Sequence, residues 1–188
     1  SSHIEGLEHR RALACVEYAL FDADGHCVAR SEEALDAIGN CATELTLSKA
    51  HLWSPETPYL YTLPTRLTVD GRTMDETTNK VGVRTILVDG KGFHLNGKLR
   101  KFQGVCLHHD LGPLGAAVNR AALIRQIRIL KDMGCDAIRT AHNMPSTMQM
   151  EVCDSMGMMV MAESFDMWLY PKCKNGYAMH FRDWAERD

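Results

Sequence analysis

The sequence lacks long apolar runs and basic runs, and each absence excludes a class of protein. The longest apolar stretch, GMMVMA at 157–162, is far too short to span a bilayer. The net charge is −3, and no cluster of lysine and arginine offers a surface for nucleic acid or anionic lipid. No signal-peptide pattern opens the sequence. We therefore expect no nucleic acid and no membrane among its partners.

Cysteine pairs at metal-ligand spacing are also absent. The seven cysteines are scattered, odd in number and never in a CxxC pair, which argues against a disulfide framework and against a zinc cage. We interpret most of them as small core residues in a reducing compartment, which favours a cytoplasmic location. They are Cys15, Cys27, Cys41, Cys106, Cys135, Cys153 and Cys173.

The first half of the chain alternates between apolar and polar residues. This pattern runs over residues 1–92, and turn signals such as Asp70-Gly71 separate its segments. Several short strands with turns between them predict an antiparallel sandwich. TELTL at 43–47 is expected to be one of these strands. The segment SEEALDAI at 31–38 also fits a helical turn, so its structure stays open.

The second half changes its period. Apolar segments of strand length alternate with segments whose apolar residues repeat at helical spacing, after a hairpin on Asn96-Gly97. Parallel strands joined by helices predict a parallel sheet whose faces are covered. The strands are expected within 102–110, 135–142 and 158–166. The helices are expected at 119–134, at 145–157 and around Tyr177, Phe181 and Trp184.

Polar side chains follow each of the three predicted parallel strands. Ligands of such sheets bind at the carboxyl ends of the strands, so we expect these side chains to form one shared site. They are His108, His109 and Asp110 at the first strand, Arg139, His142 and Asn143 at the second, and Glu163 and Asp166 at the third.

One chemistry that suits these residues is metal-dependent hydrolysis. His108 and Asp110 are two residues apart, so they share one face of an extended strand. Together with His142 and Glu163 they resemble the ligand set of a metal-dependent barrel hydrolase. No local motif has metal-ligand spacing, which counts against this alternative.

The other chemistry is recognition of a polyhydroxylated substrate. Histidine, asparagine and carboxylates paired with arginine can hold several hydroxyl groups by directional hydrogen bonds. Trp168 and Trp53 offer flat apolar faces for the C–H surface of a sugar, although core packing is the favoured interpretation of Trp53. Arg139 fits an ion pair with Glu163 equally well, and the two roles are compatible.

Long motifs in a fixed order also carry a resemblance to a known family. They are LWSPETPYLYTL, KVGVRTILVDGKGFHLNGKLRKFQGVCLHHDLGPLG, LKDMGCDAIRTAHN, CDSMGMMVMAESFDMW and YAMHFRDWAERD. In these motifs the chain resembles the family 2 glycoside hydrolases, the β-galactosidase group in particular. The resemblance runs from about residue 10 to the end.

The resemblance implies a multi-domain fold of the β plus α/β class. Residues 1–84 would form an immunoglobulin-like β-sandwich, and SSHIEGLEHRRALA is so poor a strand sequence that the absence of the first strand stays open. Residues 85–188 would form the first βα units of a (β/α)8 TIM barrel. Three such units cannot close a barrel of eight strands, so this domain is expected to be incomplete.

The resemblance also implies roles for single residues. In the family, residues matching His108, Arg139, His142 and Asn143 line the sugar-binding subsite. Ala141 stands where a serine is common, a difference of little consequence if His142 makes the contact. The side chains expected behind this layer are Asp110, Glu163, Asp166 and Trp168.

The implied reaction is retaining hydrolysis of terminal β-galactosides by two glutamates, an acid/base and a nucleophile. Both lie beyond the third barrel strand in the family, so no catalytic residue is expected in this chain. Glu163 follows Ala162 rather than an asparagine and does not match the acid/base motif. The chain is expected to be an internal segment of a longer enzyme, inactive by itself. Galactose, glucuronic acid and mannose all remain candidate sugars.

The expected partners are a β-galactoside or related sugar and either the rest of the polypeptide or further copies of the chain. An unclosed sheet exposes unpaired backbone groups, which favours such association. Some family members hold magnesium or sodium near the active site, but no firmly bound metal or other cofactor is predicted from this segment. A non-catalytic spacer module and the metal-dependent hydrolase stay open as alternative functions.

Overall fold

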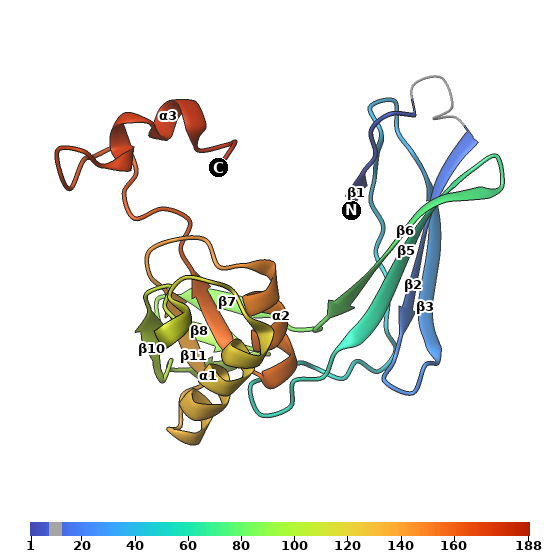
Figure 1. Cartoon of the computed structure of the whole chain (residues 1–188). Coiled ribbons are helices and arrows are strands. Elements are labelled where there is room, and N and C mark those ends of the chain that lie inside the picture. Colours follow the sequence, from blue (N-terminus) through green and yellow to red (C-terminus); the bar gives the residue numbers. More distant parts are fainter. Residues whose placement is uncertain (8–12) are drawn as a thin grey trace. The chain divides into compact units, whose positions relative to one another are not determined.

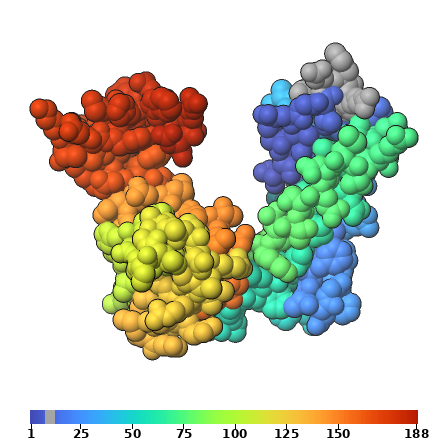
Figure 2. All heavy atoms as spheres, viewed as in Figure 1, coloured from blue at the N-terminus to red at the C-terminus, as the bar shows by residue number. Residues whose placement is uncertain are grey.

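The computed structural model describes residues 1–7 and 13–188 (Figure 1). The chain divides into two compact units, Ser1–Thr85 and Ile86–Asp188, coloured blue to green and yellow-green to red (Figure 2). The first unit contains strands and loops, and the second contains strands and helices. In the described part of the chain, no helix is long and apolar enough to cross a membrane.

The first unit is built on a four-stranded antiparallel sheet with the order β3-β2-β5-β6. Val16, Tyr18 and Leu20 of its central strand are buried, as the alternation predicts. The turn at Asp70-Gly71 has positive φ at both residues, which suits the right-handed twist of a tight hairpin. The strands are β2 (Ala14–Phe21), β3 (Cys27–Ala34), β5 (Tyr61–Val69) and β6 (Arg72–Val81).

A small second layer packs over this sheet. It consists of β1 (Ser2–His3) and β4 (Asn40–Cys41), which pair antiparallel. The Tyr18 hydroxyl lies 3.1 Å from the Cys41 sulfur and forms a core cluster with it. This polar contact ties the two layers together, because a buried phenol needs a hydrogen-bond partner.

Two expectations for the first unit are wrong, and a third falls partly on residues that the structure does not describe. The helical turn at 31–38 is wrong, because β3 continues to Ala34 in a ladder with β2. The strand at 43–47 is also wrong: Leu45 packs on the core, but the segment belongs to none of the described strands. Of the poorly marked first strand, β1 is the described part, while residues 8–12 lie outside the described residues.

The second unit opens with an antiparallel meander. Its three strands pair in sequence order. The second and third are joined at Asn96-Gly97, where φ is 51° and 74°. The predicted hairpin is confirmed, and these residue types tolerate the positive φ that it requires. The strands are β7 (Ile86–Asp89), β8 (Gly92–Leu95) and β9 (Lys98–Arg100).

A parallel three-stranded sheet follows, with the order β10-β11-β12. Leu107 pairs with Thr140, and Thr140 pairs with Ala162, so the three strands end at the same level. The predicted parallel sheet is confirmed, and neither edge strand has a further partner among the described residues. The strands are β10 (Gly104–Leu107), β11 (Ala137–Thr140) and β12 (Met159–Ala162).

Two helices, α1 (Arg120–Asp132) and α2 (Thr147–Met156), cover one face of this sheet (Figure 1). Their buried residues form one core cluster with Ile138 of the middle strand. Burial of such side chains is the main stabilising contribution to this unit. The cluster comprises Leu123, Ile127, Leu130, Ile138, Val152, Cys153 and Met158.

The predicted ends of both helices are confirmed. The Asn119 side chain accepts a hydrogen bond from the Ala122 amide, and the Ser146 hydroxyl accepts one from the Gln149 amide. Each bond satisfies an amide that has no partner within the helix. The predicted third helix is shorter than expected, because it divides into η3 (Tyr177–Met179) and α3 (Phe181–Trp184). The short 3-10 helix η2 (Gly112–Leu114) was not predicted.

The cysteines differ from the expectation. All seven are free, but only Cys41 and Cys153 are buried, and three are exposed. Burial raises the pKa of Cys153 to about 12, which leaves this thiol protonated and unreactive. The interpretation of most cysteines as core residues is therefore wrong, because several face the open side of a strand or lie in a loop.

Replacing Ile127, which is fully buried, by alanine should lower the free energy of unfolding by about 2–5 kcal/mol, because a cavity replaces the lost side chain. The matched control is Ile129→Ala in the same helix, where the side chain is 41% exposed. That change should alter stability by only about 0.5 kcal/mol. Urea denaturation followed by circular dichroism measures both, and equal losses would contradict the assignment of this core.

Candidate functional site

The candidate site lies at the carboxyl ends of β10, β11 and β12. Because the strands end level with one another, the next residues along the chain, His108, Ala141 and Glu163, also come together. The Ala141 amide donates to the Leu107 carbonyl at 2.9 Å, which extends the ladder by one bond. Register alone therefore brings residues separated by more than fifty positions to one edge of the sheet.

Arg139 stands on the face of the sheet opposite to the helices. Side chains alternate along a strand, and Ile138 next to it packs on the helical side. The register places Cys106 and Met161 beside Arg139 on the same face. The Arg139 Nη1 donates a hydrogen bond to the Cys106 sulfur at 3.4 Å. This bond helps to fix the orientation of the guanidinium group.

Glu163 binds both Arg139 and His142. Its Oε1 accepts a hydrogen bond from the Arg139 Nε at 2.5 Å, and its Oε2 lies 3.0 Å from the His142 Nδ1. The Arg139 Nη2 lies 3.3 Å from the same imidazole nitrogen. All three side chains are partly exposed. The predicted pairing of Arg139 with Glu163 is present, and His142 joins it.

The backbone of Glu163 is held by Thr140, a residue that no sequence motif singled out. The Glu163 amide donates to the Thr140 hydroxyl at 3.1 Å. Thr140 is 5% exposed and is the only buried polar side chain among the described residues. A polar residue at the last position of an apolar strand is the signal that points to it, because a buried hydroxyl needs a partner.

His108 joins this group, whereas its neighbours turn away. Its ring meets the ring of His142 edge-on, with the centroids 5.3 Å apart. The strand has already ended at Leu107, and His109 has a φ of 58°. The Asp110 carboxylate then accepts a hydrogen bond from the Gly112 amide at 2.7 Å. The expected common face of His108 and Asp110 is therefore wrong.

Asn143 lines a different hollow. It lies in a pocket between the ends of β10 and β11, the loop that contains η2, and the first turns of α1 and α2. His109 and Asp110 line the same pocket. The structure thus separates the predicted residues into two groups: His108, Arg139, His142 and Glu163 on one side, and His109, Asp110 and Asn143 on the other.

Asp166 and Trp168 follow Glu163 in the loop after β12. The Asp166 carboxylate accepts a hydrogen bond from the Lys172 ammonium at 2.8 Å. That bond lowers the pKa of Asp166, and His142 acts in the same direction when it is protonated. Trp168 is 61% exposed and stacks on Phe181 of α3, with the ring centroids 5.6 Å apart. One face of its indole is thus supported from behind by an aromatic ring.

Opposing effects act on the ionisation of Glu163. Burial raises the pKa of this carboxyl, but the hydrogen bonds from Arg139 and His142 and their charges outweigh burial, so the net pKa lies below its usual range. The Arg139 pKa is raised, first by its bond to Cys106 and then by Glu163. Glu163 is therefore an ionised hydrogen-bond acceptor at neutral pH, unsuited to act as a general acid.

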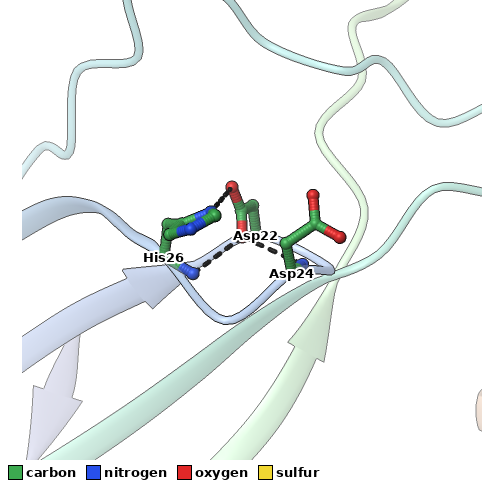
Figure 3. A group of neighbouring side chains, drawn as sticks. All are labelled: Asp22, Asp24 and His26. Carbon is green, nitrogen blue, oxygen red and sulfur yellow. Dashed lines mark hydrogen bonds and ion pairs between the residues drawn. The ribbon is translucent and has the colours of Figure 1, made fainter.

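The grouping of possible metal ligands among the described residues lies elsewhere, in the first unit. Asp22, Asp24 and His26 offer ligand atoms within 4.8 Å of one another (Figure 3). They belong to the turn between β2 and β3, where Asp22 Oδ1 accepts hydrogen bonds from the backbone amides of the other two residues. The three side chains are therefore close together because of the hydrogen bonds that form this turn.

The expected metal-ligand set of His108, Asp110, His142 and Glu163 is not assembled in the structure. The hypothesis of a metal-dependent hydrolase therefore loses its geometric basis.

The fold and the site together define a class, a β-sandwich followed by the opening of a glycosidase-type barrel, and comparison with known families identifies it. The model described as "Glycosyl hydrolases family 2" matches residues 3–84, and "Glycosyl hydrolases family 2, TIM barrel domain" matches residues 86–172. The chain belongs to family 2 of the glycosyl hydrolases. The predicted family and fold class are confirmed.

Curated relatives of two activities are similar to the chain. "Beta-galactosidase BoGH2A" of Bacteroides ovatus is 46% identical over 175 residues, which are 90% of this chain and 21% of the relative. "Beta-glucuronidase" of Rattus norvegicus is 34% identical over 165 residues, 85% of this chain and 24% of the relative. The chain thus spans about a fifth to a quarter of these relatives.

Solved structures share the same fold. A glycosyl hydrolase family 2 member from Bacteroides cellulosilyticus superimposes with a TM-score of 0.82 at 38% identity, over 93% of this chain and 23% of its own. A beta-glycosidase from Bacteroides vulgatus gives a TM-score of 0.79 at 37% identity, over 93% and 22% of the two chains.

Replacing Arg139 by glutamine should raise the pKa of Glu163, because its strongest hydrogen-bond donor then carries no charge. In the unchanged chain Glu163 has a depressed pKa, so its stabilising contribution is present above the ordinary value of 4.5 and is lost as the pH falls through the lower folded-state value. Carbon-13 NMR of the labelled carboxyl groups measures this titration.

The control is Arg120→Gln, which removes an exposed arginine paired with Glu151 at 2.8 Å. It should leave the Glu163 titration unchanged. An identical titration curve of the Glu163 carboxyl group in the two variants would show that the Arg139 guanidinium does not lower the pKa of this group.

Proposed function

We propose that this chain forms one wall of the sugar-binding subsite of a retaining glycosidase that hydrolyses terminal β-galactosides. The observation that supports this most directly is the group of His108, Arg139, His142 and Glu163 at the carboxyl ends of parallel barrel strands. Imidazoles beside a fixed ion pair suit hydroxyl groups, which both donate and accept hydrogen bonds. In this proposal the sugar contacts are made by His108, Arg139 and His142, whereas Asn143, expected to join them, lines the separate pocket with His109 and Asp110.

The charge balance of the site favours an uncharged hexose over a uronic acid. A glucuronide carries a carboxylate, which needs a cation that is not already neutralised. Arg139 is bound to Glu163, and Lys172 is bound to Asp166. The relative with 46% identity is named a beta-galactosidase, which agrees with this choice. Beta-glucuronidase is the second candidate, because several other relatives carry that name.

The catalytic glutamates of the proposed enzyme lie outside this chain. Glu163 is the carboxylate at the strand ends that binds Arg139, and both of its oxygens are engaged. In our proposal the remaining barrel strands of a longer polypeptide pair with β10 and β12, whose outer edges have no partner among the described residues. The role of the chain is then to bind and orient the sugar.

The chain of 188 residues should release no nitrophenol from p-nitrophenyl β-galactoside, because it holds no acid/base and nucleophile pair. A continuous absorbance assay at high protein concentration measures this. Turnover that disappears in the Glu163→Gln variant would refute the assignment of Glu163 as a non-catalytic residue.

In the longer polypeptide, p-nitrophenyl β-galactoside should be hydrolysed with a higher kcat/KM than the matching β-glucuronide. His142→Ala should lower kcat/KM for the galactoside by about tenfold or more, because one hydrogen bond to the sugar is lost. The control is His51→Ala, which removes an exposed histidine of the first unit that stacks on Tyr59. A preference for the glucuronide would favour the second candidate, and equal effects of both alanine variants would contradict the site.

A further inference from the structure

The hydrogen bonds around His142 determine which of its nitrogens carries the proton. Two groups lie within hydrogen-bond distance of Nδ1: the Glu163 Oε2 at 3.0 Å and the Arg139 Nη2 at 3.3 Å. An ionised carboxylate can only accept, and a guanidinium can only donate. The neutral ring therefore either donates from Nδ1 to Glu163 or accepts at Nδ1 from Arg139.

The carboxylate is the stronger partner of the two. With a bare Nδ1, the lone pair of the ring would face a lone pair of an anionic oxygen at 3.0 Å, which is repulsive. With a proton on Nδ1, each donor has its own oxygen, because Arg139 binds Oε1 and His142 binds Oε2. Both alternatives are charge-assisted hydrogen bonds, so the shorter contact decides: 3.0 Å to Glu163 against 3.3 Å to Arg139 favours the proton on Nδ1.

Glu163 is itself held in place from two sides. Its amide donates to the buried Thr140 hydroxyl, and its carboxylate binds Arg139, which also contacts Cys106. The residue before it, Ala162, is fixed in register with Thr140. Backbone and side chain are thus both restrained, so the carboxylate can orient the imidazole rather than follow it.

We propose that Glu163 is a positioning residue that holds neutral His142 in the tautomer with the proton on Nδ1, so that Nε2 accepts a hydrogen bond from a hydroxyl group of the sugar. The inference rests on the proposed function for the identity of the ligand, although the tautomer itself does not. An imidazole oriented through one nitrogen presents the other with a defined role. The subsite then favours sugars that have a hydroxyl group able to donate a hydrogen bond to Nε2.

Other charged or titratable groups also act on His142. The His108 ring stands edge-on to it, and the Asp166 carboxylate attracts the imidazole when it is protonated. Neither of these groups is hydrogen-bonded to Nδ1. Removal of the Glu163 carboxylate should therefore allow the proton of His142 to move from Nδ1 to Nε2.

The test is long-range nitrogen-15 NMR of the histidine side chains in the 188-residue chain, at a pH where His142 is neutral. The unchanged chain should show His142 predominantly with Nδ1 protonated and Nε2 bare. Glu163→Gln should shift the population towards protonated Nε2, because an amide can either donate or accept at Nδ1. The matched control is Glu151→Gln, the same substitution in a glutamate paired with the exposed Arg120, which should leave His142 unchanged.

A His142 that carries its proton on Nε2 in the unchanged chain would overturn the inference. So would an unchanged tautomer in a folded Glu163→Gln variant. If that variant does not fold, the unchanged chain alone still decides. The NMR measurement needs no sugar, so it stays valid even if the enzyme does not prefer the galactoside. Conversely, finding the other tautomer of His142 would not change the measured kinetic preference.

Discussion

The parallel register of β10, β11 and β12 is the constraint on which the candidate site depends. Leu107, Thr140 and Ala162 are paired across the sheet, so the strands end level, and the next residues meet at one edge. A shift of one residue in a strand would turn its side chains to the other face. Arg139 would then point into the helical core, and the ion pair with Glu163 would not form.

The ion pair gives the site its electrostatic character. Arg139 and Glu163 neutralise each other, and neighbouring Asp166 and Lys172 do the same. Hydrogen bonds and charges keep the Glu163 pKa low despite its burial. Such a site offers fixed hydrogen-bonding groups with little net charge, which suits recognition of a neutral sugar better than proton transfer to it. This agrees with the proposed role of the chain in binding the sugar.

The local expectations that were confirmed share one physical cause, because each depends on short-range chemistry. The two helices begin near the expected residues because the caps at Asn119 and Ser146 satisfy nearby amides, and the hairpin at Asn96-Gly97 needs only residues that tolerate positive φ. The expectations that failed depend on distant partners. Residues 43–47 alternate like a strand but have no ladder in the described part of the chain, while residues 31–34 join a ladder that helical propensity cannot reveal.

The sequence by itself determined the order of strands and helices, the edge of the sheet where polar residues gather, and the family motifs. These follow from periodicity, turn residues and residue type, which are properties of neighbouring positions. Only the tertiary structure decided that His108 stays with His142 while Asp110 and Asn143 face another pocket, and that Thr140 holds the backbone of Glu163. The reason is that a strand's last residue and the backbone direction after it depend on pairing with other strands, which no local pattern records.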